Sequence, residues 1–213
     1  MDIVNIENSI LLVDDHLIVR KGIELILMGA IPKVTIYHAE NYEEALEIIK
    51  AVKLDLILLD ITINGIENIK IMSAIKALQE SVKILVFSSH EEKLYGLRYI
   101  QKGADGYLNK FCDEKKIIAV VKEILEKGNF YSEEIKEKLN SNSGKKYISN
   151  SIDTLSNREF EVAQLLINGY GNLEISNKLE VQMSTVSTYK NRIFEKLSVN
   201  NIVALSDLFK ENG

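Results

Sequence analysis

The first 127 residues alternate short apolar runs with longer amphipathic stretches. The runs are rich in aliphatic side chains and nearly unbroken, which is typical of strands that are covered on both faces. The stretches between them have room for helices of about 10 to 15 residues, and this alternation favours βα units around a parallel sheet. The pattern predicts an α/β domain with a five-stranded, doubly wound parallel sheet, its strands at residues 10–13, 34–37, 56–59, 84–87 and 106–108.

Capping residues and a glycine mark helix boundaries in this half. Asn41 stands three residues before Glu44, a pair that can cap the start of a helix. The last helix is predicted to begin near Asp113 and to end at Gly128. Its predicted buried face consists of four aliphatic residues, Ile117, Val120, Val121 and Ile124. These signals complete a domain of five βα units.

A polar stretch rich in Asn and Ser, residues 140–153, follows this half of the chain. Small turn-forming residues without a sustained period are typical of a linker. The segment just before it, residues 131–139, can form a short helix. We therefore divide the chain into a first domain at residues 1–128, a linker at residues 129–153 and a second domain at residues 154–213.

The C-terminal part of the chain has helical periodicity and no strand signal. Ser156 and Glu159 form the pattern of a capping box at the start of its first helix, and Gly169 and Gly171 end that helix. Three further helices are predicted at residues 172–179, 184–197 and 201–209. The result is a small all-α domain of four helices, in which the tight turn between the second and third has the spacing of a helix-turn-helix.

Three carboxylates and one ammonium lie just beyond the ends of predicted strands. Asp14 and Asp15 follow the first strand, Asp60 follows the third, and Lys110 lies beyond the last. Ligands of open α/β sheets bind beyond the carboxyl ends of the strands, so these four groups are predicted to share one pocket. Carboxylates forced together repel unless a hard divalent cation lies among them, and Mg²⁺ takes one or two carboxylates plus waters and a phosphate oxygen. The sequence therefore predicts a magnesium-assisted phosphoryl site.

Each group has a role in this prediction. Asp60 is the nucleophile that accepts a phosphoryl group. Asp15 and Asp60 ligate Mg²⁺ together with the main-chain carbonyl of Thr62, and Asp14 holds a water of the metal. Lys110 neutralises the phosphate, because the charge in phosphoryl transfer lies on the peripheral oxygens.

Four motifs in this half resemble those of the receiver domain of bacterial two-component response regulators. They are Val13-Asp14-Asp15-His16, Asp60-Ile61-Thr62, Phe87-Ser88-Ser89 and Gly106-Tyr107-Leu108-Asn109-Lys110, within a similarity that covers about residues 9 to 127. The fold expected from this resemblance is flavodoxin-like. The resemblance also implies that Asp60 takes a phosphoryl group from the phosphohistidine of a sensor kinase, and that Ser88 and Tyr107 are the switch residues.

The loop after Asp60 departs from the pattern of receivers. Asn64 stands at the usual place of a proline, and only Gly65 remains of the usual glycines. We expect phosphorylation to survive because the acidic pair and the lysine are intact. Thr62 and His90, each two residues beyond a phosphate-contacting position, are predicted to set how fast the phosphate hydrolyses.

The third helix of the second domain has a face suited to DNA. Val186, Ile193 and Leu197 share one face at helical spacing and are predicted to be buried. The predicted DNA contacts are small polar or basic residues, namely Thr185, Ser187, Thr188, Lys190, Asn191 and Arg192. The formal net charge of the chain is −5, which argues against nucleic-acid binding, but residues 184–196 hold three basic residues against one acidic residue. The positive charge of the domain is thus concentrated on this helix.

The second domain also resembles the LuxR-type helix-turn-helix from about residue 155 to residue 208. The motifs that carry this similarity include Leu155-Ser156-Asn157-Arg158-Glu159, Asn172-Leu173-Glu174-Ile175 and Ser184-Thr185-Val186-Ser187-Thr188-Tyr189. In that family the third helix lies in the major groove and the last helix forms dimers. The two domains in this order resemble the NarL/FixJ class of response regulators.

This resemblance implies a transcription factor and not an enzyme. Mg²⁺-dependent phosphorylation of Asp60 is expected to control dimerisation and sequence-specific DNA binding. The expected partners are a sensor histidine kinase, double-stranded DNA and, after phosphorylation, a second copy of the chain. A single cysteine, Cys112, and an N-terminus without a basic start or long apolar stretch predict a reducing, cytoplasmic location. No apolar run approaches the length of a membrane span.

Two other functions fit parts of the pattern. A haloacid-dehalogenase-like phosphatase or phosphotransferase also uses an aspartyl phosphate, but needs a second acid where Thr62 stands. Alternatively, a DNA-binding regulator could use the first domain as a constitutive dimerisation or interaction module, which the altered loop after Asp60 supports. The three histidines, His16, His38 and His90, are spaced as in no compact metal-binding motif.

Overall fold

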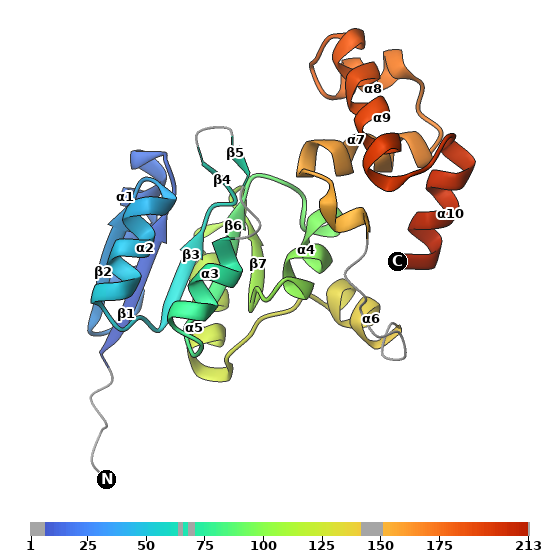
Figure 1. Cartoon of the computed structure of the whole chain (residues 1–213). Helices are drawn as coiled ribbons and strands as arrows, with labels where there is room; N and C mark the ends of the chain where they lie inside the picture. Colours follow the sequence, from blue (N-terminus) through green and yellow to red (C-terminus); the bar gives the residue numbers. More distant parts are fainter. Residues whose placement is uncertain (1–6, 64–65, 68–70, 142–150, 213) are drawn as a thin grey trace. The chain divides into compact units, whose positions relative to one another are not determined.

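The computed structural model describes residues 7–63, 66–67, 71–141 and 151–212. The chain forms two compact units, residues 1–140 and residues 141–213 (Figure 1). Asn64 and Gly65, on which the predicted change of loop pattern rests, lie outside the described residues.

A five-stranded sheet with the order β2-β1-β3-β6-β7 forms the centre of the first unit. The strands are β1 (Asn8–Val13), β2 (Val34–Ala39), β3 (Leu56–Leu59), β6 (Lys83–Ser88) and β7 (Gly106–Asn109), and all four neighbouring pairs are parallel. This confirms the five predicted strands and the doubly wound topology. The hairpin of β4 (Thr62–Ile63) and β5 (Ile66–Glu67) is not predicted by the sequence pattern, because two residues are too few to show a period.

Helices cover both faces of this sheet (Figure 1). They are α1 (Leu17–Ala30), α2 (Tyr42–Ala51), α3 (Ile71–Leu78), α4 (Glu92–Gln101) and α5 (Glu114–Lys127). Helix α1 packs against α5, and α2 packs against α3. Alternate residues of β1, Ile10 and Leu12, join the core that α1 and α5 cover, while Leu11 and Val13 are buried as well. Burial on both faces explains why the strands are nearly unbroken apolar runs.

The predicted helix ends of this unit are confirmed by their capping contacts. The side chain of Asn41 accepts a hydrogen bond from the Glu44 amide at 2.9 Å. Asp113 caps α5 in the same way, and Gly128 ends it with a φ of 88°, a left-handed conformation that favours glycine. Helix α6 (Glu133–Ser141) follows, and its Ile135 packs closely against Gly96 of α4.

The second unit contains a short 3₁₀ turn, η1 (Ser151–Thr154), and four α-helices. They are α7 (Asn157–Ile167), α8 (Asn172–Lys178), α9 (Met183–Leu197) and α10 (Ile202–Asn212). The predicted capping box is confirmed, since Ser156 and Glu159 bond each other's main-chain amides. Val186, Ile193 and Leu197 of α9 are buried as predicted. One side of α9 therefore packs into the core of the unit, and the side opposite these three residues faces outward.

Candidate functional site

The chain topology brings the predicted phosphoryl-site residues to one edge of the sheet. Asp14, Asp60 and Lys110 each follow the last residue of a strand, and the amide of each donates to a carbonyl of the neighbouring strand, at 3.2, 2.8 and 2.8 Å. From β1 the chain adds β2 on one side and then β3 on the other, so the strand order reverses between β1 and β3. Asp14 and Asp60 lie at the ends of these two strands. This switch point is where ligands of doubly wound sheets bind.

Lys110 reaches two buried carboxylates, Asp60 across β6 and Asp14 across both β6 and β3. Its Nζ lies 2.6 Å from Oδ2 of Asp14 and 2.7 Å from Oδ2 of Asp60, and both aspartates are only 4% exposed. Since β7 and β3 are two strand spacings apart, roughly 10 Å, only a long side chain can span this separation. The predicted meeting of these three groups is present in the structure.

Asp15 and His16 complete the polar cluster at this edge. The Nδ1 atom of His16 lies 2.8 Å from Oδ1 of Asp15 and 3.1 Å from Oδ1 of Asp14. Ligand atoms of Asp14, Asp15, His16 and Asp60 all lie within 4.8 Å of one another. Three carboxylates at this separation are the oxygen donors that a hard divalent cation takes, so the residues fit such a cation. His16 is not predicted from the sequence, because spacing alone does not show that its ring turns back onto the aspartates.

The two carboxylate oxygens of Asp60 have different partners. Oδ1 accepts a hydrogen bond from the Thr62 amide at 3.1 Å, and Oδ2 accepts from Lys110. Burial raises the pKa of Asp60 above its usual value, and the charge of Asp14 adds to that, while Lys110 and the Thr62 amide offset only part of it. Three carboxylates lie here beside one ammonium, so the ionised site has an excess of negative charge, which would favour a bound cation.

The pKa of Lys110 shifts in the direction that keeps it charged. Burial on its own would lower this pKa, but the hydrogen bonds and charges of Asp14 and Asp60 outweigh burial and raise it. An ammonium fixed between two carboxylates is therefore available to a third anion at the same edge. This is the property expected of a group that neutralises a transferring phosphoryl.

The predicted switch residues meet at the turn after β6. Ser88 is buried, and its Oγ accepts a hydrogen bond from the His90 amide at 3.2 Å. The hydroxyl of Tyr107, which is also buried, donates to the His90 carbonyl at 3.1 Å. Burial raises the pKa of Tyr107, so the phenol remains protonated and can keep donating. The turn of residues 88–90 thus contains Ser88 and also His90, which is predicted to tune hydrolysis. Tyr107 contacts this turn from β7.

Two residues that the sequence argument missed support this edge. Arg20 is a buried arginine of α1, and its guanidinium donates to the main-chain carbonyl of Asp14. Asn109 donates from Nδ2 to the His90 carbonyl at 2.9 Å and accepts from the Phe111 amide at 2.8 Å. An arginine at helical spacing within an amphipathic pattern, or an asparagine at a strand end, carries no signal that separates such contacts from surface positions.

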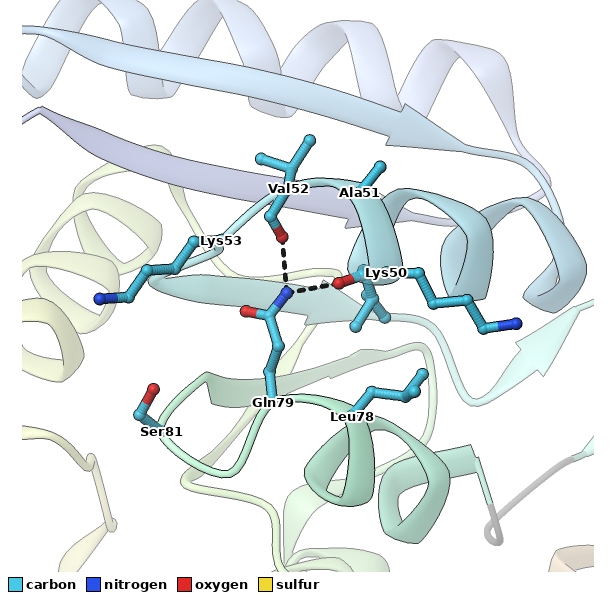
Figure 2. Close-up of a pocket in the computed structure, with 8 residues that line it drawn as sticks. Lys50, Ala51, Val52, Lys53, Leu78, Gln79 and Ser81 are labelled. Atoms are coloured by element: carbon cyan, nitrogen blue, oxygen red, sulfur yellow. Dashed lines mark hydrogen bonds between the residues drawn. The ribbon is translucent and has the colours of Figure 1, made fainter.

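A separate pocket of about 450 Å³ lies at the other end of the sheet, between the ends of α2 and α3 (Figure 2). Gln79 bridges it by donating from Nε2 to the carbonyls of Ile49 and Val52, each at 2.5 Å. Its Oε1 accepts from the Leu54 amide at 3.0 Å. Lys50 and Lys53 point away from Gln79 in Figure 2. No charged groups converge among these lining residues, so the pocket does not resemble a second phosphoryl site. The contacts of Gln79 instead join the end of α3 to the end of α2.

The outward side of α9 carries the predicted DNA-contacting residues. Thr188, Asn191 and Arg192 are exposed, whereas Thr185, Ser187 and Lys190 are half-buried. A groove of about 300 Å³ runs over this helix and is lined by Ser184, Thr185, Thr188, Tyr189 and Arg192. The ammonium of Lys190 lies 5.6 Å from the ring centre of Phe194, one turn further along the helix.

An ion pair and a hydrogen bond from α7 hold the helix-turn-helix in place. Glu159, a buried residue of α7, lies 2.6 Å from Nζ of Lys196 in α9. Arg158 donates to the carbonyl of Leu179 at the end of α8, at 2.6 Å, and pairs with Glu161 at 2.7 Å. Helix α7 thus fixes the ends of both helices of the motif.

Known protein families match both units of this chain. The response regulator receiver domain matches residues 10–122, and the luxR family of bacterial regulatory proteins matches residues 153–209. The Fimbriae Z protein of Escherichia coli K12 is 33% identical over 95% of this chain and 96% of its own length. The response regulator GacA of Pseudomonas aeruginosa is 30% identical, with 96% of each chain covered.

Solved structures agree on the fold. The RcsB response regulator of Salmonella typhimurium has a TM-score of 0.57 at 24% identity, covering 96% of this chain and 98% of its own. A structure of an RcsB–DNA complex has a TM-score of 0.56 at 22% identity, covering 98% and 100%. Among the described residues, none of the helices is both long and apolar enough to cross a membrane.

These matches confirm the resemblance that the sequence motifs carry. The family matches also support two of the partner classes that it implies, a sensor histidine kinase for the receiver domain and DNA for the second domain. The family is one of DNA-binding transcription regulators rather than of classical enzymes. The chain belongs to the two-component response regulators of the NarL/FixJ class, in which a receiver domain precedes a LuxR-type DNA-binding domain.

Proposed function

We propose that Asp60 is the phosphoryl acceptor of this regulator, and that its phosphorylation controls dimerisation and DNA binding in the cytoplasm. The observation that carries the proposal is the position of Lys110, whose ammonium lies within 2.7 Å of Asp14 and Asp60 at the switch point of the sheet. A strand-end lysine that reaches two buried carboxylates fits a group that will receive a third anion. Residues 1–128, 129–153 and 154–213 would then be the receiver, the linker and the DNA-binding domain.

The proposed transfer uses Asp60 as the nucleophile. An oxygen of its carboxylate forms a bond to phosphorus while the bond from phosphorus to the imidazole nitrogen of the donor breaks, and that imidazole keeps the bonding electron pair and takes up a proton. Lys110 and the Thr62 amide each hold one oxygen of Asp60, which orients the carboxylate and favours its ionised form. Mg²⁺ supplies charge neutralisation for the phosphoryl oxygens when it is bound. Asp14, Asp15, Asp60 and the main-chain carbonyl of Thr62 are its proposed ligands, directly or through water.

The proposed switch is the turn formed by residues 88–90. A phosphoryl group brings roughly −1.5 to −2 charges to the pocket, and the Ser88 hydroxyl can donate to it. A movement of Ser88 toward the phosphoryl group would alter the turn, and the His90 carbonyl of that turn accepts a hydrogen bond from the Tyr107 hydroxyl. Tyr107 would thereby report the phosphorylation state to the surface around α4, β7 and α5.

The proposed DNA-binding surface is the outward side of α9, with Thr185, Ser187, Thr188, Lys190, Asn191 and Arg192. Lys190→Ala should weaken binding to all DNA sequences similarly, because a lysine there contacts the backbone. Asn191→Ala should relax preference at one base position by about 1 to 3 kcal/mol. Equal loss of preference in both variants would contradict this division of roles.

Intact mass after incubation with acetyl phosphate and Mg²⁺ tests the central proposal. The expected result is one phosphate adduct that requires Mg²⁺, that is lost in Asp60→Asn and that persists in Asp55→Asn, which changes an exposed aspartate before β3. Sizing of the same samples should show dimers only where the adduct forms. A protein that binds DNA but never gains the adduct would instead support the phosphorylation-independent regulator.

A further inference from the structure

The first two turns of α9 present carbon groups to solvent. Met183, the first residue of the helix, is 53% exposed although it is a large apolar side chain. Residues 183–188 include no charged side chain, and the basic groups of α9 begin at Lys190. The part of the helix that would enter a DNA groove first therefore differs chemically from the part behind it.

Two of the four hydroxyl groups in these turns are directed at the helix itself. Ser187 Oγ donates to the Met183 carbonyl at 3.1 Å, and Thr188 Oγ1 donates to the Ser184 carbonyl at 3.0 Å. Ser187 Oγ also accepts from Nδ2 of Asn172 in α8, at 3.2 Å. Hydroxyls that bond the carbonyl one turn earlier have used their proton inside the helix. Ser187 and Thr188, both among the predicted DNA contacts, thus have no hydroxyl proton left to donate to a base.

The remaining group on the Thr188 side chain is its methyl. With Oγ1 held by the Ser184 carbonyl, Cγ2 is the other substituent of Cβ, and the residue is exposed. Thr188 also lines the groove of about 300 Å³ along α9. Met183 and Thr188 thus each carry an apolar group at an exposed position in the first two turns of the helix.

Apolar contacts in the major groove recognise one chemical group. Thymine carries a C5-methyl there, whereas the other base edges present hydrogen-bond donors and acceptors. We propose that Met183 and Thr188 read thymine methyl groups, so that this regulator selects sites by the positions of thymines in the major groove. The inference rests on the proposed binding of DNA through α9 and adds the class of base contact that provides preference.

The test compares duplexes that differ only in thymine methyl groups. Binding sites are first selected from a random duplex pool with the phosphorylated full chain, and each selected duplex is then made with deoxyuridine in place of thymidine at one position at a time. At one or two positions the affinity should fall about fourfold, the loss expected for one methyl group removed from an apolar contact. Replacement outside the selected site should change nothing.

Two substitutions at position 188 separate the methyl from the hydroxyl. Thr188→Ser removes only the methyl and should bind thymidine and deoxyuridine duplexes equally at the affected position. Thr188→Val keeps a methyl, removes the hydroxyl and should preserve the difference. Met183→Ser should reduce the difference at the same or a neighbouring position.

The possible results separate a failure of methyl recognition from a failure of DNA binding through α9. Wild-type protein that binds both duplexes equally at every position would overturn methyl recognition while leaving DNA binding in place. Preference lost in Thr188→Val and kept in Thr188→Ser would show that the hydroxyl reads the base. Failure to select any site would refute DNA binding by this surface and the inference with it.

Discussion

Replacing Lys110 with methionine should destabilise the receiver unit strongly at neutral pH. The substitution keeps a side chain of similar length but removes the ammonium that lies 2.6 and 2.7 Å from two carboxylates, each of which is about 5% exposed. Removing one partner of a buried ion pair typically destabilises a protein by about 3 to 5 kcal/mol, because the remaining charge is left uncompensated. We expect a loss in this range at pH 7 without Mg²⁺.

The loss of stability in Lys110→Met should depend on pH. The pKa of Asp60 is already raised in the folded protein, and losing the ammonium raises it further. A carboxyl whose folded pKa exceeds its unfolded pKa stabilises the fold fully at pH values below the unfolded pKa, and this contribution is lost as pH rises through the folded pKa. One carboxyl that takes up a proton recovers about 1.36 kcal/mol per pH unit, so the loss should shrink by up to about 2.7 kcal/mol between pH 7 and pH 5.

Hydrogen exchange measured by mass spectrometry isolates this unit within the full chain. Peptides from β1 and β3 report the free energy of opening of the sheet, whereas a single melting curve would mix the two units. Lys122→Met, at an exposed position of α5, is the matched control and should change little. A Lys110→Met loss that equals the control, or that is the same at pH 5 as at pH 7, would refute the argument from uncompensated charge.

Further predictions concern the DNA-binding unit and the sheet. Lys196 and the Ser156 amide outweigh the effect of burial and lower the pKa of Glu159, so its stabilisation is present above the unfolded value of 4.5 and is lost as pH falls through the folded value. Glu159→Gln should destabilise α9 by about 1 to 2 kcal/mol at pH 7 and should remove this acid sensitivity, measured by exchange of α9 peptides. Gly106→Ala should cost about 1 to 3 kcal/mol, because a Cβ there would lie 3.3 Å from the rigid main-chain oxygen of Phe130 as well as against two side chains. In a urea titration of both variants Gly96→Ala should cost less, since its Cβ would meet only side-chain carbons of Ile135 and Glu92 and no main-chain atom.

The acidic pocket could be predicted from sequence because topology alone creates it. Parallel strands end at one edge, so the residues that follow β1, β3 and β7 must lie near one another whatever their rotamers. Asp14, Asp60 and Lys110 are of this kind. The structure adds their contacts, and the lysine's simultaneous approach to both carboxylates is a matter of side-chain length that spacing does not reveal.

The contacts that sequence did not predict depend on side-chain rotamers. Asn109 and His16 could each have pointed to solvent without altering any periodicity, and an arginine such as Arg20 is ordinarily a surface residue. The hydrogen bonds of the Ser187 and Thr188 hydroxyls depend on rotamers as well, since a helix allows these groups either to face outward or to bond the preceding turn. Helix pattern predicts which face is outward, but not which atoms that face presents.

The turn at residues 88–90 is held from β7 by several hydrogen bonds that act on the same few atoms. The His90 carbonyl accepts from both Tyr107 and Asn109, and the Lys110 amide donates to the Ser88 carbonyl. A movement of Ser88 toward a phosphoryl group would therefore act on β7, because the carbonyls of Ser88 and His90 are both bonded to groups of that strand or of the residue after it. If each of the two bonds to the His90 carbonyl contributes about 1 kcal/mol, their joint loss shifts a conformational equilibrium roughly 30-fold, within the usual range of allosteric coupling. Lys110 directly follows the strand that holds Tyr107 and Asn109, so the group proposed to neutralise the phosphoryl and the groups that hold the turn would move together.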